Sequence, residues 1–426
     1  MGQTIVEKIF TSHSIENKEV YAGEYVTAKV DLARLHENFA RVYRILKEEG
    51  LREDMQDVLW DREKVVVGLD HYSPPNNEKV AEEQKLVRKL AEKFRINHFY
   101  DINEGVLHQV VLDNALVLPG MLVVGTDSHT TTYGAYNAAA TGIGYTEMAY
   151  VLLTGELFFR VPETIKFEIS GKPQECVTSK DLILYIAGNF GTEVAQYKAI
   201  EFRGDAIENM TISSRITMSN MSVELGAKFG IFEADSRLLS HLKAITERKF
   251  DPVYADPDAE YEKEYFIDFS DVEPYVAKPH TIDNSVPVTE VSGIPIDQAV
   301  IGSCTNGRLE DLELACKILE GNKVKRGVRL LIVPASKKVY TEAVRRGMVN
   351  VLIDAGATVL NPGCGPCFGG HVGLLAPTEV CISTTNRNFK GRMGSDKAEI
   401  YLASPLTVAA SAIKGEITDP REFLKG

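Results

Sequence analysis

Three cysteines stand in segments that could bring their thiols together. Cys304 lies within the motif GSCTNGR, and Cys364 and Cys367 form a C-x2-C pair within NPGCGPC. Each motif follows an apolar run of strand length, at 298–301 and at 358–360. Parallel strands bring their carboxyl ends to one edge of a sheet, where open α/β sheets bind their ligands. We therefore expect the three thiols to converge, and three thiolates suit a soft metal centre.

The residues alone leave three interpretations of this centre open. A zinc ion would need a fourth ligand, and His371 follows Cys367 by four residues, which allows a Cys3His site. An iron–sulfur cluster normally takes four cysteines, so three would leave one iron open as a Lewis acid for a substrate oxygen. Thiols that bind no metal are the third interpretation. The remaining cysteines are expected in structural positions: Cys176, Cys316 and Cys381.

Histidines and carboxylates gather where predicted strands end or turns lie. They are Asp70 and His71 after a strand at 64–69, His108 in a predicted turn, and Asp127 and His129 after a strand at 121–125. A single histidine is often only a structural polar group, but three of them near carboxylates indicate acid–base chemistry. Further along the chain, Asn220 and Glu224 are four residues apart and would share one face of a helix.

The elements that must position these residues alternate regularly. Apolar runs of strand length are followed by segments of helical period along nearly the whole chain, which is typical of α/β domains with parallel sheets. We expect three α/β units, at 1–162, 163–285 and 286–426. The first would carry the histidines with their carboxylates, the second the Asn–Glu pair, and the third the cysteines. One helix of the third unit is predicted at 339–354.

The overall composition narrows the kind of partner. The 426 residues include 47 Lys and Arg against 60 Asp and Glu, which gives a net charge of −13. An acidic chain without a basic stripe argues against nucleic acid or an anionic membrane surface, and favours a small substrate. The N-terminal residues lack the apolar core of a signal peptide, and no stretch has the roughly 20 mainly apolar residues of a membrane span. We therefore expect a cytoplasmic protein with reduced cysteines.

Four motifs together resemble those of the aconitase superfamily: GTDSHTTTYGA, GSCTNGR, CGPC and NRNFKGR. The likeness extends over essentially the whole chain. In length and motif order the chain is similar to the large subunits of the two-subunit members, the 3-isopropylmalate dehydratase and homoaconitase type. The resemblance implies three α/β/α domains with mainly parallel sheets around a central iron–sulfur cleft. It also implies one [4Fe-4S] cluster on Cys304, Cys364 and Cys367, with one iron not bound by a protein thiolate.

The same resemblance implies roles for the remaining candidates. Six side chains would form catalytic histidine–carboxylate pairs: Asp70 with His71, Asp127 with His108, and Glu224 with His129. Five others would line the cluster or bind the substrate: Ser128, Asn220, Asn386, Arg387 and Arg392. The implied activity is that of a hydro-lyase. The open iron would polarise the substrate hydroxyl, His71 would deliver the proton that makes water the leaving group, and rehydration at the neighbouring carbon would complete an isomerisation.

The resemblance also implies a protein partner. The family's base is a serine, accompanied by carboxylate-binding arginine, on a fourth, swivelling domain. The sequence here stops at Gly426, soon after the third expected unit. We therefore expect a small subunit to supply the swivel domain.

The implied substrate is a hydroxy di- or tricarboxylate, and 3-isopropylmalate is the first expectation. Homoaconitase activity is the second, and another malate-type dehydratase, such as one for 2,3-dimethylmalate, is the third. The third stays open because the chain departs from the family at two places: His36-Glu37 is followed by Asn38-Phe39 rather than by a nearby Thr and Pro, and Tyr145 is unusually bulky. More distant alternatives are a zinc-stabilised structural subunit and a non-catalytic RNA-binding protein; the net charge and the acid–base residues argue against the latter.

Overall fold

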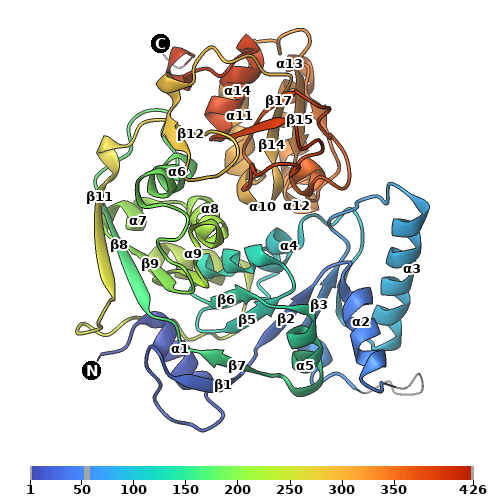
Figure 1. Cartoon of the computed structure of the whole chain (residues 1–426), viewed down its shortest axis with the longest axis vertical. Coiled ribbons are helices and arrows are strands. Elements are labelled where there is room, and N and C mark those ends of the chain that lie inside the picture. The colour runs from blue at the N-terminus through green and yellow to red at the C-terminus, as the bar shows by residue number, and fades with distance from the viewer. Residues whose placement is uncertain (1, 52–57, 424–426) are drawn as a thin grey trace.

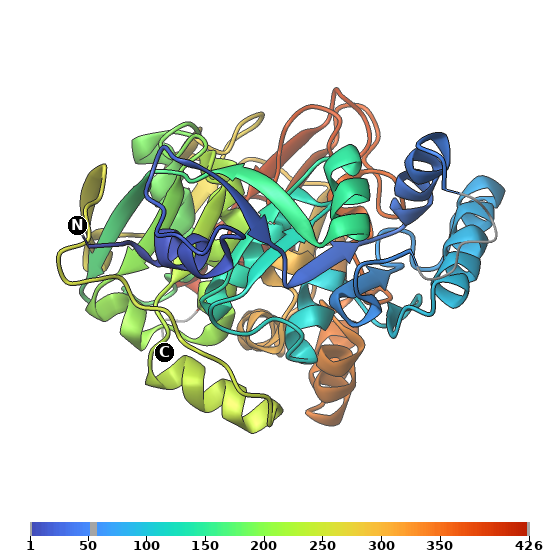
Figure 2. The same ribbon diagram turned by 90° about the horizontal axis from the view of Figure 1, so that it is seen from below.

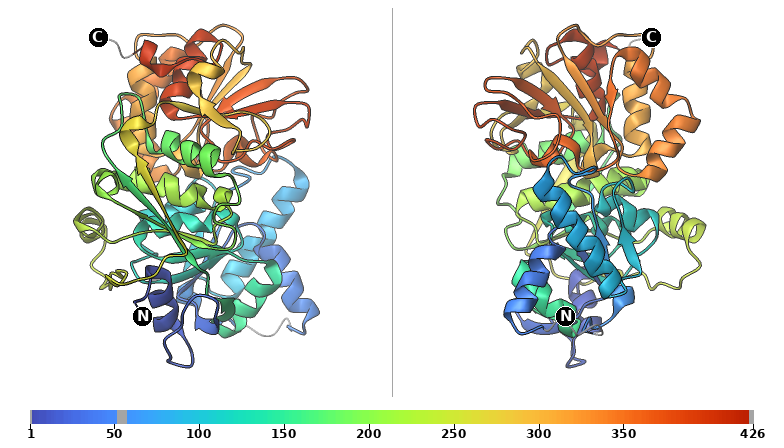
Figure 3. Two further views of the ribbon diagram at one scale, coloured as in Figure 1. Left: turned by 60° about the vertical axis from the view of Figure 1, so that its left-hand side comes forward. Right: turned by 90° about the vertical axis from the view of Figure 1, so that its right-hand side faces the viewer.

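The computed structural model describes residues 2–51 and 58–423. Within them, mainly parallel sheets and their helices form three α/β units around a common centre (Figure 1). In both views of Figure 3 the third unit, coloured orange and red, lies above the other two. This mixed architecture confirms the predicted fold class.

The first unit is built on a parallel sheet with the strand order β4-β3-β2-β5-β6. The strands are β2 (Leu32–Leu35), β3 (Val65–Gly68), β4 (His98–Tyr100), β5 (Leu122–Gly125) and β6 (Ala139–Gly142). Its helices are α1 (Ile5–His13), α2 (Phe39–Glu48), α3 (Glu78–Lys93), α4 (Leu107–Asp113) and α5 (Tyr145–Thr154), with the 3-10 helices η1 (Arg62–Lys64) and η2 (Ser128–Tyr136). An antiparallel pair, β1 (Tyr25–Lys29) with β7 (Glu156–Arg160), lies in the foreground of the view from below (Figure 2).

The second unit has the parallel strand order β10-β9-β8-β11. The strands are β8 (Thr164–Ser170), β9 (Ala199–Arg203), β10 (Phe229–Phe232) and β11 (Lys263–Asp268). Its helices are α6 (Ser179–Phe190), α7 (Asp205–Asn209), α8 (Ile212–Met221), η3 (Ser222–Leu225), α9 (Ser236–Ile245) and η4 (Phe269–Asp271). Helix α8 packs against η2 of the first unit, so the two units share an interface.

The third unit has the strand order β13-β12-β18-β17-β14-β15-β16. The strands are β12 (Tyr275–Ala277), β13 (Ser285–Pro287), β14 (Gln298–Gly302), β15 (Arg329–Val333), β16 (Thr358–Val359), β17 (Val380–Ser383) and β18 (Glu399–Leu402). Its helices are η5 (Val288–Glu290), α10 (Ser303–Asn306), α11 (Leu309–Leu319), α12 (Lys337–Arg345), α13 (Met348–Ala355), η6 (Gly365–Phe368), α14 (Pro405–Lys414) and η7 (Pro420–Glu422). β12 is antiparallel to both of its neighbours. The unit boundaries after residues 162 and 285 stay predictions, and the pairing of β12 with β18 joins a strand from before residue 285 to the third sheet.

Three local predictions differ from the structure. The helix predicted at 339–354 is two helices, α12 and α13, because Gly347 between them has a φ of +75°, outside the helical region. His108 lies in the first turn of α4 rather than in a turn between elements. Helix α8 ends at Met221, so Glu224 belongs to the 3-10 helix η3 and does not continue the helix of Asn220. No helix within the described ranges is long and apolar enough to span a membrane.

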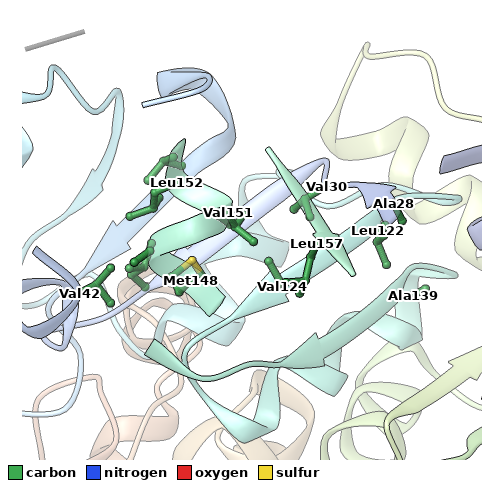
Figure 4. Packing of buried hydrophobic residues seen from close by; sticks show 14 of the residues in the cluster. Ala28, Val30, Val42, Leu122, Val124, Ala139, Met148, Val151, Leu152 and Leu157 are labelled. Atoms are coloured by element: carbon green, nitrogen blue, oxygen red, sulfur yellow. The ribbon is translucent and has the colours of Figure 1, made fainter. Parts of the chain in front are cut away.

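The apolar core of the first unit packs helix α5 against the sheet. Met148, Val151 and Leu152 on one face of α5 are fully buried, and Leu122 and Val124 of β5 belong to the same apolar cluster (Figure 4). Burying a side chain of this size contributes roughly 1.5–3 kcal/mol. This packing fixes the carboxyl ends of β3 and β5, which Asp70 and Asp127 follow.

Candidate active site

Cys304 is placed by a tight passage from strand to helix. β14 ends at Gly302, which has a φ of +148° and lies so close to β15 that a Cβ would be 2.2 Å from the Val333 carbonyl oxygen. Only glycine fits there, and the chain turns directly into α10, which carries Cys304. The Cys304 side chain is buried, and its Sγ accepts a hydrogen bond from Nδ2 of Asn220 at 3.3 Å.

The other two thiols stand in a loop that is tied to the first unit. The N–H of Cys364 donates to the carbonyl oxygen of Asp70 at 3.0 Å. A Cβ on the preceding Gly363 would lie 2.9 Å from that same oxygen. Cys367 follows in η6, and its N–H donates to the Cys364 carbonyl at 3.3 Å. The loop after β16 is thus held against the loop after β3.

The structure brings the three thiols to one place. Asn386 lies between two of them, since its Nδ2 is 3.6 Å from Sγ of Cys304 and its Oδ1 is 3.6 Å from Sγ of Cys367. Cys304 and Cys364 pack in one small buried cluster. The remaining cysteines contribute to other apolar clusters: Cys176, Cys316 and Cys381.

These groups fit an iron–sulfur cluster better than a Cys3His zinc site. Burial raises the pKa of Cys304 to about 11 and raises the pKa of Cys364 as well, so both thiols need a cation to lose their protons. The Nε of Arg392 is buried without a hydrogen-bond acceptor among the described residues, and a sulfide-rich anion would supply one. His371 is engaged elsewhere, because its Nε2 lies 2.7 Å from the carbonyl oxygen of Pro74.

Asp70 and His71 follow β3 and form the first histidine–carboxylate pair. Nδ1 of His71 lies 2.7 Å from Oδ1 of Asp70. The other carboxylate oxygen accepts from the N–H of Leu107 at 2.7 Å and from Arg34 at 3.2 Å. Burial opposes a charge on His71, but Cys364 and Asp70 beside the ring raise its pKa well above the ordinary value. His71 is therefore suited to donate a proton.

The other two pairs meet at the segment after β5. Nε2 of His108 is 3.1 Å from Oδ1 of Asp127, and Nε2 of His129 is 2.9 Å from Oε1 of Glu224. Burial and the nearby Arg34 lower the pKa of His108 to about 4, so this ring is neutral near pH 7. Burial alone would raise the pKa of Asp127, but His108, His129 and Arg34 hold it well below the ordinary value.

The candidate substrate-binding residues surround the same centre. Nη2 of Arg387 donates to Oγ of Ser128 at 2.9 Å, and its Nε lies 2.7 Å from Oε1 of Glu224. Nη2 of Arg392 reaches to 3.9 Å from Sγ of Cys367. The two asparagines stand beside the sulfurs, as given above: Asn220 and Asn386.

Sequence reasoning missed Arg34, which is completely buried in β2. Its Nη2 is 3.2 Å from Oδ2 of Asp70, and its Nη1 is 3.9 Å from Oδ2 of Asp127. One cation thus lies beside two carboxylates, the buried Asp70 and the partly buried Asp127, each belonging to a different histidine pair. The only signal in the sequence was an arginine inside a short apolar run, which does not reveal its partners.

Replacing Arg34 by methionine is expected to destabilise the fold. The buried Asp70 and the partly buried Asp127 would lose their shared cation, and breaking a buried ion pair from one side costs about 3–5 kcal/mol. Chemical denaturation would measure the change in the free energy of unfolding. The control is Arg88→Met, which removes the partly exposed pair with Asp101 and should cost at most about 1 kcal/mol. Equal losses in the two variants would contradict this account of Arg34.

Lys180 is a second buried cation that the sequence did not reveal. It lies in the first turn of α6, is fully buried, and its Nζ donates to the carbonyl oxygens of Thr384 at 2.9 Å and Thr385 at 2.6 Å. Burial lowers the pKa of Lys180 to about 7. These bonds fix the backbone immediately before Asn386, which faces the thiols.

The two places where the sequence was expected to depart from the family, the segment after His36-Glu37 and Tyr145, lie apart in the structure. Tyr145 begins α5, and its ring faces the guanidinium of Arg41 at 4.6 Å, so it contributes to the packing of α5 on α2. His36 and Glu37 lie at the site itself. With the first histidine–carboxylate pair they form a group whose potential ligand atoms all lie within 4.8 Å of one another.

Comparison with known proteins identifies the family. The family model described as Aconitase family (aconitate hydratase) matches residues 8–293 and 289–415. The chain is 48% identical over 425 residues to the 3-isopropylmalate dehydratase large subunit 1 of Methanopyrus kandleri, with 100% of both chains covered. It is 46% identical over 431 residues to the 3-isopropylmalate dehydratase large subunit of Aquifex aeolicus, covering 100% of this chain and 98% of that one. It is 48% identical over 396 residues to a probable methanogen homoaconitase large subunit of Methanosarcina mazei, covering 93% and 100%. Because these matches extend over every segment that builds the site, the chain belongs to the aconitase family, a family of hydro-lyases.

Proposed function

We propose that this chain is the large subunit of a hydro-lyase that isomerises a hydroxy acid by removing and re-adding water, with 3-isopropylmalate as the substrate. The observation that carries the proposal is the meeting of three buried thiols and three histidine–carboxylate pairs in one site. The substrate is supported by the names of the Methanopyrus kandleri and Aquifex aeolicus relatives.

Membership in the aconitase family implies an iron–sulfur cluster. In our proposal Cys304, Cys364 and Cys367 hold a [4Fe-4S] cluster and leave one iron without a protein thiolate. When bound, the cluster supplies a Lewis acid that weakens the carbon–oxygen bond of the substrate hydroxyl. Asn220 and Asn386, whose amides donate toward Sγ of Cys304, would stabilise its thiolate form.

Two arginines would bind the substrate carboxylates. A guanidinium is always charged near neutral pH and presents a fork of donors that matches a carboxylate. Arg387 is held in place by Glu224 and Ser128, and Arg392 lies over the ring of Phe389 at 5.4 Å. Both side chains are thus positioned before a substrate arrives, so they lose less conformational entropy when the substrate binds.

His71 would deliver the proton to the departing hydroxyl. Because Asp70 engages Nδ1 at 2.7 Å, Nε2 is the atom that is left to donate toward a substrate. This nitrogen is 3.7 Å from Oδ2 of Asp127. The protonated hydroxyl would leave as water beside Nε2 of His71, and transfer of a proton from water back to His71 would serve rehydration.

The test is turnover of 3-isopropylmalate by the cluster-loaded chain together with its small subunit. His71→Ala should keep the brown cluster and lower kcat by ~10²–10⁴, the usual contribution of a positioned acid. The control is His98→Ala, which removes a partly exposed ring whose Nε2 is 3.8 Å from Glu63, and it should leave kcat unchanged. Full activity in loaded His71→Ala would reject the proton-donor role. If the wild-type complex turns over no hydroxy acid while a positive control shows that the assay works, the proposed function is rejected.

A homoaconitase large subunit is the second candidate, favoured by the Methanosarcina mazei relative. A tricarboxylate carries one more negative charge than 3-isopropylmalate, so its binding would need a further cation at the site. The same complex is therefore assayed with homoaconitate. The substrate with the higher kcat/KM decides between the two assignments.

A further inference from the structure

Asn38, which follows His36-Glu37 after β2, is held in a single orientation. Its Oδ1 accepts from the backbone N–H of His36 at 3.3 Å and from Oγ1 of Thr126 at 2.8 Å. Its Nδ2 donates to the carbonyl oxygen of Thr126 at 3.2 Å. A backbone N–H can only donate and a carbonyl can only accept, so these bonds fix which end of the amide is nitrogen.

This orientation determines where His36 carries its proton. Nδ2 of Asn38 lies 2.6 Å from Nε2 of His36. Because the amide nitrogen donates, Nε2 of His36 must accept, and the neutral ring carries its proton on Nδ1. That Nδ1 lies 3.4 Å from Oε2 of Glu37. Asn38 thus selects the form of His36 whose N–H lies beside the Glu37 carboxylate, close to it but not in a hydrogen bond.

His36 and Glu37 in turn hold His71 from two sides. The rings of His36 and His71 are stacked, with centroids 4.2 Å apart and planes 22° from parallel. Oε1 of Glu37 accepts from the backbone N–H of His71 at 3.1 Å and of Tyr72 at 3.2 Å. The ring and the backbone of His71 are therefore both supported by the segment after β2.

We propose that Asn38 is a positioning residue for His71. It acts through the Nδ1–H form of His36, which keeps the two rings stacked and Glu37 in place. The hydrogen bonds of Asn38 to Thr126 also connect the segment after β2 to the segment after β5, which carries Asp127. Through Glu37 the same network reaches the segment after β3, so the distance between the segments after β3 and β5 is fixed. The inference rests on the proposed function, in which His71 donates the proton.

Asn38→Asp separates this role from simple packing. Aspartate has the same size and can still accept the bonds from Oγ1 of Thr126 and the backbone N–H of His36. Its carboxylate cannot donate to Nε2 of His36 or to the carbonyl oxygen of Thr126, so the His36→Gln variant, which keeps the Thr126 bonds, isolates the histidine part of the effect. In Asn38→Asp the ring of His36 must then place a proton on Nε2, either by changing tautomer or by becoming a cation beside His71. We expect kcat of the cluster-loaded complex to fall roughly 10- to 100-fold, because misplacing a reacting group by about 1 Å has effects of this size. KM should stay unchanged, since Asn38 touches no group that we assign to carboxylate binding.

A second measurement does not depend on turnover. Ring-nitrogen NMR shifts of the ¹⁵N-histidine-labelled chain, recorded without iron, distinguish the Nδ1–H, Nε2–H and doubly protonated forms. The His36 signals are assigned by their loss in His36→Gln. In the wild-type chain they should report Nδ1–H, and in Asn38→Asp they should report a proton on Nε2. His36→Gln should also lower kcat as Asn38→Asp does, which covers the case that the aspartate variant does not fold.

The matched control is Asn137→Asp. Asn137 is fully buried, whereas Asn38 is partly buried, and Asn137 donates to two backbone carbonyls, those of Phe232 and Val253, at 2.9 Å each, on the side of β10 and away from β3. Its variant should lower thermal stability but leave kcat per folded, loaded complex and the His36 signals unchanged. Wild-type kcat in both Asn38→Asp and His36→Gln, or a wild-type His36 signal of the Nε2–H form, would overturn the inference. A wild-type complex that turns over no hydroxy acid would instead reject the proposed function, and the NMR result would still decide the tautomer.

Discussion

Replacing any one of Cys304, Cys364 and Cys367 by serine is expected to remove the brown absorbance of the chain and all turnover. Each thiol is buried, and the other three cysteines pack in different apolar clusters, so none of them stands ready to replace a missing ligand. A serine hydroxyl is a hard, weakly acidic ligand and does not substitute for thiolate at a soft centre. Iron and sulfide analysis after anaerobic reconstitution measures the loss directly.

Two variants provide the controls for this experiment. Cys316→Ser changes a thiol on α11 whose Sγ is 3.7 Å from the Met348 carbonyl oxygen, and it should keep full iron and sulfide. His371→Ala should keep them as well, because that ring is engaged with the Pro74 carbonyl. Loss of the metal in His371→Ala would favour the Cys3His zinc geometry instead. A full cluster in any of the three serine variants would remove that cysteine from the ligand set.

The convergence of the thiols could be expected from the sequence because it depends on local patterns. Short apolar runs identify the strands, and the motifs after them need glycine to pass close to a neighbouring strand, as Gly302 does against β15. Parallel pairing then brings the loops after β14 and β16 to one edge without any knowledge of side-chain contacts. The break at Gly347 was less visible, since a glycine inside a helical pattern is often tolerated.

The buried cations could not be expected, because their partners are distant in the chain. Arg34 pairs with a carboxylate 36 residues away, and Lys180 donates to a carbonyl 204 residues away. A charged residue within an apolar run gives no information on whether it will be buried or which group will neutralise it. The pairing of His129 with Glu224, which are 95 residues apart, came from the resemblance to the family and not from spacing.

The chain without a small subunit is expected to be catalytically silent even when its cluster is complete. Burial alone would raise the pKa values of Asp70, Asp127 and Glu224, yet the neighbouring histidines and arginines lower all three, which makes these carboxylates weak bases. His108 is also a weak base, because its pKa lies at about 4. His71 is suited to donate a proton rather than to accept one, since its raised pKa favours the protonated ring. In our proposal the site offers His71 as a proton donor and two arginines for carboxylates, whereas the three carboxylates and His108 are poor bases at neutral pH.

Dehydration needs loss of the hydroxyl and removal of a proton from the adjacent carbon, so a strong donor cannot replace a missing base. The names of the relatives describe them as large subunits, and in our proposal the small subunit supplies the base. Anaerobic assays of the fully loaded chain should show turnover at least about 10²-fold below that of the complex, the smallest usual contribution of a general base. Adding the small subunit of 3-isopropylmalate dehydratase should restore activity in proportion to complex formed. Full turnover by the large chain alone would contradict this prediction and would mean that substrate binding activates one of the chain's own weak bases. We would then expect His108→Ala to abolish that turnover, because Nδ1 of His108 is buried without a hydrogen-bond partner among the described residues.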